Sequence, residues 1–287
     1  MTALLDAVAA AGDRLVTASN GRIAFDPRRA LARDDDRDLV PAWTGGRLDD
    51  EPWDAVIGAA AGRAAAEMVA AGAELHLPVA IVGEAEPLAP PVLTPGRPNG
   101  DIILDLSALW AGPYCGGLLA EAGHAVIKVE SPGRPDPTPV HTPKLDARLN
   151  GGKQRLRLAL DDPELLSMIG AARVLITSAR PHALARLGFD EARLFAINPD
   201  LLWIAITAHG WTGEAAMRVG FGDDCAAAGG LLHWEEGKPR FIADALADPL
   251  TGMTAATFAL EALAADHSGL LDVSLARTAA RFAKALT

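Results

Sequence analysis

The strongest constraint on the fold is a series of short apolar runs separated by helix-forming stretches. Beyond residue 100, the strand-like runs are DIILDL, HAVIKVE, RVLITS and LLWIAIT. Each run is almost continuously apolar rather than alternating, as expected of strands that are buried on both faces of a parallel sheet. Helix-like stretches lie between or after them, at 112–123, 163–171, 181–187 and 190–196. This alternation predicts an α/β fold with a doubly wound, mostly parallel, Rossmann-like sheet.

Weaker signals extend the pattern toward the end of the chain. LRLAL at 156–160 predicts a further strand, and the alanine-rich stretch 252–265 predicts a helix. The last stretch, LLDVSLARTAARFAKAL, predicts a strand followed by a helix.

The first hundred residues have a different pattern, which predicts a small α+β segment. We expect a helix over 1–18, a turn and strand at NGRIAF, a long helix over Asp54–Ala71 and a short strand over 77–82. The stretch EAEPLAPPVLTPGRPNG is rich in proline and is typical of a linker. The predicted organisation is therefore a small segment over 1–95 and a Rossmann-like domain over 96–287.

The composition excludes several classes of protein. A formal net charge of −11 argues against a general nucleic-acid or acidic-membrane surface. No apolar run is long enough to cross a bilayer, and the start MTALLDAVAAAGDRL lacks the basic region of a signal peptide. Two cysteines give no disulfide framework. We expect a cytoplasmic protein with no nucleic-acid partner and no membrane partner.

The usual short motifs for metals and nucleotides are also missing. The seven histidines show no HExxH or HxH spacing and there is no CxxC, so we expect no metal site. The glycines after the first strand of the domain are Gly112, Gly116 and Gly117, which do not form GxGxxG. A nicotinamide or flavin site is therefore not indicated. The hydrolase pattern GxSxG and the Walker pattern are absent as well.

One long stretch is more specific than its periodicity. DLSALWAGPYCGGLLAEAGHAVIKVESPGRPD, at 105–136, resembles the opening motif of the family III CoA-transferases, which include formyl-CoA transferase, the carnitine CoA-transferases and α-methylacyl-CoA racemase. Five further segments resemble that family in the same order: LNGGKQRLRLALD, VLITSARPHALARLGF, IAITAHGWTGE, VGFGDDCAAAGGLL and ADPLTGMTAATFALEAL. The resemblance covers about residues 101–287.

The chain departs from the family pattern in both residues and order. Gly151 stands where the family has arginine, Gly222 where it usually has aspartate and Ala226 where it usually has glutamine. The part of the chain from DLVPAWTGG to LPVAIV looks like the family's late small-domain segment, yet it comes first here. We infer a permuted and shortened arrangement.

Asp244 and Asp248 lie four residues apart in IADALADPLTGM. From the residues alone, Asp248 is interpreted as a helix N-cap with Pro249 at the first helical position. The resemblance implies that Asp248 is also the catalytic aspartate. In the family mechanism, it attacks an acyl-CoA thioester and forms a mixed anhydride. CoA thiolate then gives an aspartyl-CoA thioester, and an acceptor carboxylic acid takes over the CoA. Asp244 is interpreted as a loop carboxylate.

The resemblance also implies residues that bind coenzyme A. Arg180 and Arg186 match two family arginines, and cations of this kind suit the phosphates of CoA. Lys153 lies in the segment after LN and is a further candidate, with ordinary surface charge as the alternative. Trp110 and Ala111 follow the first strand of the domain, where open α/β sheets bind ligands, although Trp110 also suits a core position. Family members form interlocked dimers, so we expect a homodimer.

Two alternatives to CoA transfer stay open on the sequence. In the racemase branch of the family, a histidine serves in proton transfer at the position of Phe221, and phenylalanine cannot do so. Asp223 and Asp224 either partly replace the missing family acid or serve a turn, and His209 is interpreted as a packing histidine. The shortened small segment and the changes at Gly151, Gly222 and Ala226 motivate the second alternative, a non-catalytic acyl-CoA-binding homologue.

Overall fold

The chain is described by a computed structural model that covers residues 14–25, 36–47, 51–97 and 100–286. It divides into two compact units. The first unit consists of Met1–Leu88, Met217–Asp248 and Leu275–Thr287, and the second consists of Ala89–Ala216 and Pro249–Ser274. The sequence predicts a boundary near residue 95 between two consecutive segments, and that boundary stays a prediction. The two compact units are defined by contacts, and the first unit contains two segments from later in the chain.

The second unit contains a seven-stranded sheet with the order β4-β12-β9-β8-β5-β6-β7. The central strands are β5 (Ile102–Asp105), β8 (Val174–Thr177) and β9 (Leu202–Thr207), flanked by β6 (Ala125–Glu130), β7 (Gln154–Arg157) and β12 (His267–Ser274). These strands are parallel, whereas the two-residue edge strand β4 (Thr94–Pro95) pairs antiparallel with β12. All residues of β8 and β9 are buried, which explains their continuous apolar runs.

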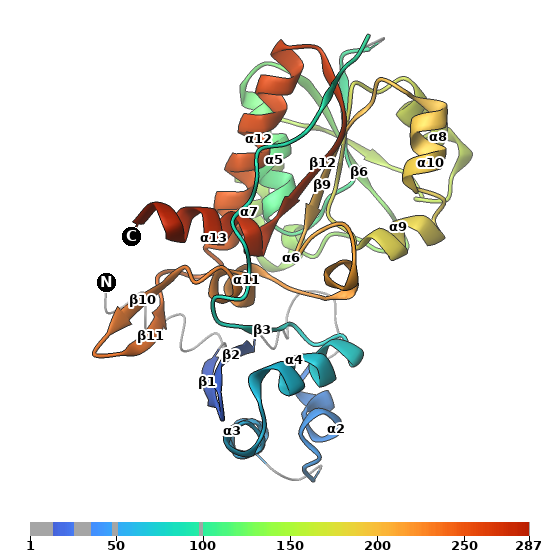
Figure 1. Ribbon diagram of the computed structural model, residues 1–287. Helices are drawn as coiled ribbons and strands as arrows, with labels where there is room; N and C mark the ends of the chain where they lie inside the picture. The colour runs from blue at the N-terminus through green and yellow to red at the C-terminus, as the bar shows by residue number, and fades with distance from the viewer. Residues whose placement is uncertain (1–13, 26–35, 48–50, 98–99, 287) are drawn as a thin grey trace. The chain divides into compact units, whose positions relative to one another are not determined.

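Helices cover both faces of this sheet (Figure 1). One face carries α5 (Ala111–Glu121), α7 (Pro143–Asn150) and α12 (Ala247–Ala264). The other carries α8 (Pro163–Gly170), α9 (Pro181–Arg186) and α10 (Glu191–Ile197), whose Leu165, Leu184 and Leu194 share a core with Leu175 and Trp203 of the sheet. The predicted fold class, a doubly wound and mostly parallel α/β sheet, is confirmed.

Two helices between β6 and β7 are missing from the sequence prediction. α6 (Thr138–His141) and α7 occupy the stretch TPVHTPKLDARLN. Pro139 and Pro143 make this stretch look irregular, but each proline lies in the first turn of its helix, where no backbone N–H is needed.

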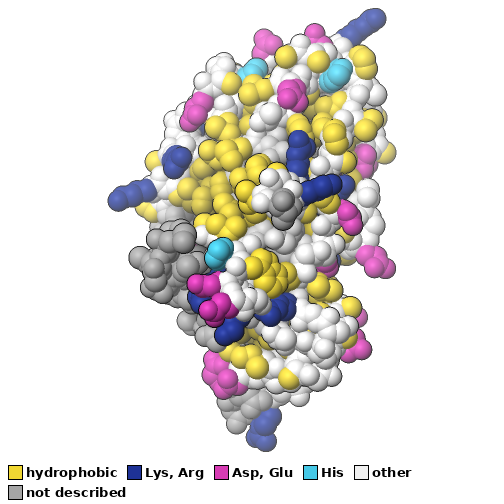
Figure 2. Space-filling view, turned by 60° about the vertical axis from the view of Figure 1, so that its left-hand side comes forward, with side chains coloured by type: hydrophobic (Ala, Val, Ile, Leu, Met, Phe, Trp, Pro, Cys, Tyr) yellow, Lys and Arg dark blue, Asp and Glu magenta, His cyan; other side chains and the backbone are white. Residues whose placement is uncertain are grey.

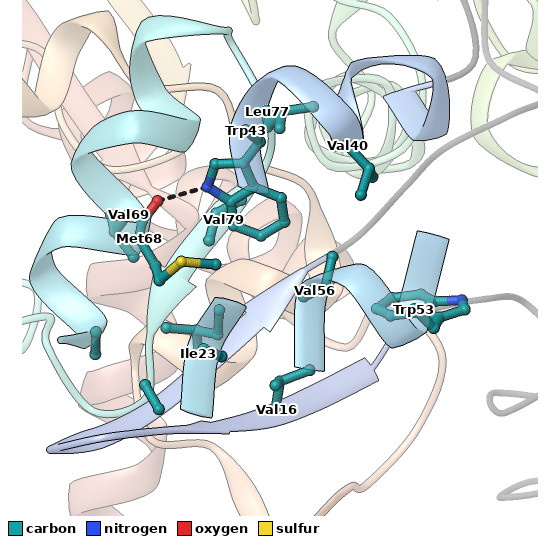
Figure 3. Close-up of a cluster of buried hydrophobic side chains, with 13 residues drawn as sticks. Val16, Ile23, Val40, Trp43, Trp53, Val56, Met68, Val69, Leu77 and Val79 are labelled. Carbon is teal, nitrogen blue, oxygen red and sulfur yellow. Dashed lines mark hydrogen bonds between the residues drawn. The ribbon is translucent and has the colours of Figure 1, made fainter. Parts of the chain in front are cut away.

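The first unit begins with a three-stranded antiparallel sheet, β1 (Arg14–Ala18), β2 (Gly21–Phe25) and β3 (Val79–Ile81). A buried cluster joins this sheet to α2 (Val40–Thr44), α3 (Pro52–Gly62) and α4 (Ala65–Glu74). Figure 3 shows Trp43 at the centre of the cluster, with its indole Nε1 donating to the carbonyl of Met68 at 2.8 Å. The small α+β segment therefore has a core of its own.

Two sequence expectations for this unit are wrong in part. The helix expected over 1–18 is a strand at 14–18, because RLVTA pairs with β2 across a tight turn; residues 1–13 lie outside the described part. The single helix expected over Asp54–Ala71 is two helices, broken at Arg63 and Ala64. The turn between β1 and β2 causes the break, because Asn20 accepts the N–H of Ala65 and Ser19 donates to the carbonyl of Arg63.

The later segments of the first unit add α11 (Gly222–Ala228), α13 (Leu275–Leu286) and a hairpin of β10 (Leu232–Glu235) with β11 (Lys238–Phe241). This hairpin is absent from the sequence prediction. Glu236 and Gly237 both have positive φ, the geometry of a tight hairpin turn. Within the described ranges, no helix combines the length and the apolar character needed to cross a membrane.

Candidate active site

The order of strands in the second unit places a topological switch point at the carboxyl ends of β5 and β8. These two strands are neighbours, but the chain leaves β5 toward β6 and leaves β8 toward β9, on the opposite side. Open α/β sheets bind ligands outside the carboxyl ends of strands where the direction reverses in this way. The two loops concerned are linked, because the N–H of Ala108 donates to Oγ of Ser178 at 2.9 Å.

Trp110 and Ala111 lie where the loop after β5 leads into α5. Trp110 is partly buried and immediately precedes α5, whereas Ala111 is the buried first residue of that helix. Leu109, just before them, has a φ of +70°, which is unusual for a residue other than glycine. Its N–H lies 3.4 Å from Oδ1 of Asp136, so the loop that carries Trp110 is held in a strained shape.

Arg180 and Arg186 lie on the β8 side. Arg180 is the residue immediately before α9 and is partly buried, and Arg186 is the last residue of that helix and is exposed. Arg180 therefore follows the carboxyl end of β8, whereas Arg186 lies at the other end of α9. A guanidinium group near the carboxyl end of a parallel strand suits the phosphates of a nucleotide-like ligand.

Lys153 has a different environment from the two arginines. Its Nζ lies 2.7 Å from Oδ2 of Asp105, 2.7 Å from the carbonyl oxygen of Pro113 and 2.7 Å from Oδ1 of Asn150. An ammonium group has three hydrogens, and three protein oxygens accept them here. Direct contact with a ligand would require Lys153 to leave these partners, so its geometry favours a role in supporting the loop after β5.

Asp105 is the centre of this buried network. Burial alone would raise the pKa of its carboxyl group, but the charges of Lys128 and Lys153, with hydrogen bonds from Lys153 and Ser107, together lower that pKa below its usual value. Lys128 in turn donates to the carbonyl oxygen of Ser107 and lies 3.4 Å from Oδ2 of Asp136. The network therefore ties β5 and β6 to the strained loop.

The three glycines of α5 serve packing in this structure. A Cβ atom at Gly112 would collide with Cβ of Ser107, and one at Gly117 would lie 2.6 Å from the carbonyl oxygen of Leu149. At Gly116 it would lie 2.8 Å from Oδ2 of Asp105 and 3.0 Å from Nζ of Lys153. These glycines let α5 approach β5 and α7 closely, a role that the missing GxGxxG spacing did not reveal.

Asp248 belongs to the first unit, unlike the other five candidate residues. The helix α12 begins at Ala247, so Asp248 lies in its first turn and not at the cap position expected from the sequence. The N–H of Asp248 donates to the carbonyl oxygen of Ala245 at 2.9 Å, and its side chain is partly buried. Asp244, in contrast, is exposed, which agrees with its interpretation as a loop carboxylate.

Gly222 explains how the Asp248 carboxylate is accommodated. A Cβ atom at Gly222 would collide with Oδ2 of Asp248 and would lie 2.5 Å from Cα of Ala245. Any side chain at position 222, including the aspartate of the family pattern, would need space that Asp248 and Ala245 fill. Glycine at position 222, where the family usually has aspartate, therefore fits the space that Asp248 and Ala245 leave.

Comparison with protein families decides the assignment. The family model described as CoA-transferase family III matches residues 99–286. The chain belongs to CoA-transferase family III. The matched range contains all six candidate residues, namely Trp110, Ala111, Lys153, Arg180, Arg186 and Asp248, and it leaves out the residues before 99.

Individual proteins that are named CoA-transferases also match part of this chain. Succinyl-CoA–D-citramalate CoA-transferase of Chloroflexus aurantiacus is 33% identical over 184 residues, which make up 59% of this chain and 46% of the relative. Human succinyl-CoA:glutarate CoA-transferase is 29% identical over 184 residues, or 56% of this chain and 42% of the relative. The chain thus spans about half the length of the curated relatives that it matches.

Solved family structures have the same fold. A crystal structure of the Mycobacterium tuberculosis protein Rv3272 matches 67% of this chain and 59% of its own chain, with a TM-score of 0.59 and 28% identity. A CAIB/BAIF family protein from Brucella suis matches 64% of this chain and 55% of its own, with a TM-score of 0.54 and 26% identity.

Proposed function

We propose that this family III chain transfers CoA between an acyl-CoA thioester and a carboxylic acid, with Asp248 as the nucleophile. The observation that carries the proposal is the position of Asp248 in the first turn of α12, in a segment that matches the family model. The dipole of a helix favours an anion near its N-terminus, so this position suits the anionic carboxylate that nucleophilic attack requires.

The proposed reaction has four balanced steps. An oxygen of the Asp248 carboxylate attacks the thioester carbonyl; a C–O bond forms, the C–S bond breaks and CoA thiolate leaves. The thiolate attacks the aspartyl carbonyl of the mixed anhydride, which releases the first carboxylate and leaves an aspartyl-CoA thioester. The acceptor carboxylate then attacks the carbonyl of the aspartyl-CoA thioester, which releases CoA thiolate and forms a second mixed anhydride. CoA thiolate attacks the acceptor's carbonyl in this anhydride, which gives the new acyl-CoA and frees the Asp248 carboxylate.

In this proposal, the switch point of the second unit binds the CoA moiety. Arg180 and Arg186 pair with its phosphates, and Trp110 and Ala111 contact it from the loop after the neighbouring strand β5. Lys153 was expected to contact CoA as well, and its three internal hydrogen bonds favour an indirect contribution through Asp105 and the loop after β5. The active form is a homodimer, as the family resemblance implies.

The names of the relatives guide the choice of substrates. Several act on short dicarboxylic acids, as in succinyl-CoA:glutarate and acetyl-CoA:oxalate CoA-transferase, and one is named a probable fatty acyl-CoA transferase. The panel for testing this chain should therefore contain succinyl-CoA, acetyl-CoA and a long-chain acyl-CoA, each with dicarboxylic and monocarboxylic acceptors.

The test is covalent trapping at Asp248. After incubation with each acyl-CoA, hydroxylamine should convert the anhydride or thioester to a hydroxamate, and peptide mass spectrometry should map it to Asp248. Asp248→Asn should abolish both adduct and CoA exchange, while the matched variant of the exposed neighbour, Asp244→Asn, should retain them.

Other outcomes would support the alternatives. CoA binding without any adduct or exchange in the wild type would indicate a non-catalytic binding protein. Uptake of solvent deuterium at the acyl α-carbon would indicate a racemase.

A further inference from the structure

Asp223 is a buried acidic residue that the proposed chemistry does not use. It lies in the first turn of α11, and its side chain has no exposed surface. Its Oδ1 accepts the backbone N–H of Ala245 at 2.8 Å. A buried carboxylate is costly unless hydrogen-bond donors compensate for the lost water, so this contact is expected to be firmly held.

Ala245 itself has an unusual backbone conformation. Its φ is +47°, in the left-handed region that residues other than glycine rarely adopt. The side chain of Ala245 is buried, so the surrounding structure must hold the turn in this conformation. The hydrogen bond from Ala245 to Asp223 is one contact that does so, because it fixes the direction of the N–H group.

The turn at Ala245 is directly connected to Asp248. The carbonyl oxygen of Ala245 accepts the N–H of Asp248 at 2.9 Å, so the conformation of Ala245 sets the first turn of α12. Gly222, the residue before Asp223, gives space to both Cα of Ala245 and Oδ2 of Asp248. Two hydrogen bonds therefore run from the Asp223 side chain through Ala245 to the backbone of Asp248.

We propose that Asp223 is a positioning residue that holds the Ala245 turn and thereby fixes the orientation of the Asp248 carboxylate. This inference rests on the proposed role of Asp248 as nucleophile. Nucleophilic attack is sensitive to small displacements of the reacting group, whereas CoA affinity depends on other residues. Loss of the contact therefore lowers the rate of adduct formation and leaves the acyl-CoA concentration for half-maximal rate almost unchanged.

Variants at three positions test this role. Asp223→Ala should slow adduct formation at Asp248 about tenfold to a hundredfold. Asp223→Asn should stay within about threefold of the wild type, because an amide oxygen still accepts the N–H of Ala245. Asp223→Ala combined with Ala245→Gly should regain much of the lost rate, since glycine adopts positive φ without strain.

Asp224→Asn is the control for Asp223→Asn. Asp224 is equally buried on the same helix, but its Oδ1 accepts the N–H of Phe221 at 2.6 Å and not that of the Ala245 turn. The control should leave the adduct rate within about threefold of the wild type, because the amide oxygen still accepts. An unchanged rate in Asp223→Ala, or no recovery in the double variant, would contradict the positioning role.

Hydrogen exchange in the wild type gives a readout that needs no variant to fold. The amide of Ala245 should exchange much more slowly than that of exposed Asp244, and rapid exchange at Ala245 would overturn the inference. An absent adduct in the wild type would instead reject the proposed function, and the positioning role with it. A normal wild-type adduct that is insensitive to Asp223→Ala would reject the inference alone.

Discussion

At the scale of single residues, Gly222 offers a direct test of the packing around Asp248. Gly222→Ala places a Cβ atom in collision with Oδ2 of Asp248 and 2.5 Å from Cα of Ala245, where backbone must move. We expect a loss of about 1–3 kcal/mol in the free energy of unfolding and a lower rate of adduct formation. Denaturant unfolding and the trapping assay measure the two effects.

Gly58 provides the matched control for this substitution. It lies in α3, and a Cβ atom there would have open space. Gly58→Ala should therefore raise the free energy of unfolding, by roughly 0.5–1 kcal/mol. If Gly222→Ala behaves like Gly58→Ala in both assays, Gly222 does not pack closely against Asp248.

The sequence motif marks Asp248 as a candidate, but it does not reveal the interactions around it. The contact between Asp223 and Ala245 joins residues 22 positions apart, and no local pattern encodes it. Lys153 shows the same limit, because its partner Asp105 lies 48 positions earlier. A lysine in a polar stretch looks like surface charge until the fold brings a buried carboxylate to it.

At the scale of elements, the buried pair of Lys153 and Asp105 should stabilise β5 and α5 in a pH-dependent way. Asp105→Asn leaves Lys153 without its charge partner, so we expect a loss of about 3–5 kcal/mol in the free energy of unfolding near pH 7. The folded state lowers the pKa of Asp105 below its unfolded value of about 3.9. Its ionised form therefore stabilises the fold fully above that value.

The difference in unfolding free energy between the wild type and Asp105→Asn should shrink as the pH falls below about 4 and the carboxylate becomes protonated. Denaturant titrations from roughly pH 3 to pH 7 measure this difference. Asp101→Asn is the control, since Asp101 is exposed near the start of the same strand. A constant difference across this range would show that Asp105 is not the titrating group.

Most strands and helices of the second unit could be predicted because burial on both faces of a parallel sheet leaves a clear apolar signal. The break between α3 and α4 could not, since Asn20 caps α4 from 45 positions away. The helix-forming alanines on either side of Arg63 favour one continuous helix, and a tertiary contact overrides them. The glycines of α5 were visible in sequence, but their contacts with Ser107, Asp105 and Leu149 required the fold.

At the scale of the whole molecule, segments that are far apart in the sequence belong to the same compact unit. Residues before the family match form hydrogen bonds with residues inside it: Gly83 donates to Ala227, Ala85 to Ala228 and Leu88 to Arg277. These bonds join the N-terminal segment to α11 and α13 within the first unit. A rearranged sequence order is therefore compatible with one compact unit, because contacts and not sequence order define it.

The predicted homodimer can be tested on the outer face of α12. Met253 and Leu260 are one heptad apart on this helix, so they point the same way, and each is more than a third exposed. Figure 2 shows hydrophobic side chains gathered on the viewed face, among scattered charged ones. A contiguous exposed apolar patch is typical of an interface. We expect wild-type protein to sediment as a dimer and the double variant Met253→Lys/Leu260→Lys to shift it toward monomer.

Ile57→Lys, which changes an exposed apolar residue of α3, is the control and should leave the dimer intact. A monomeric wild type would reject the homodimer, and a dimeric double variant would place its interface elsewhere.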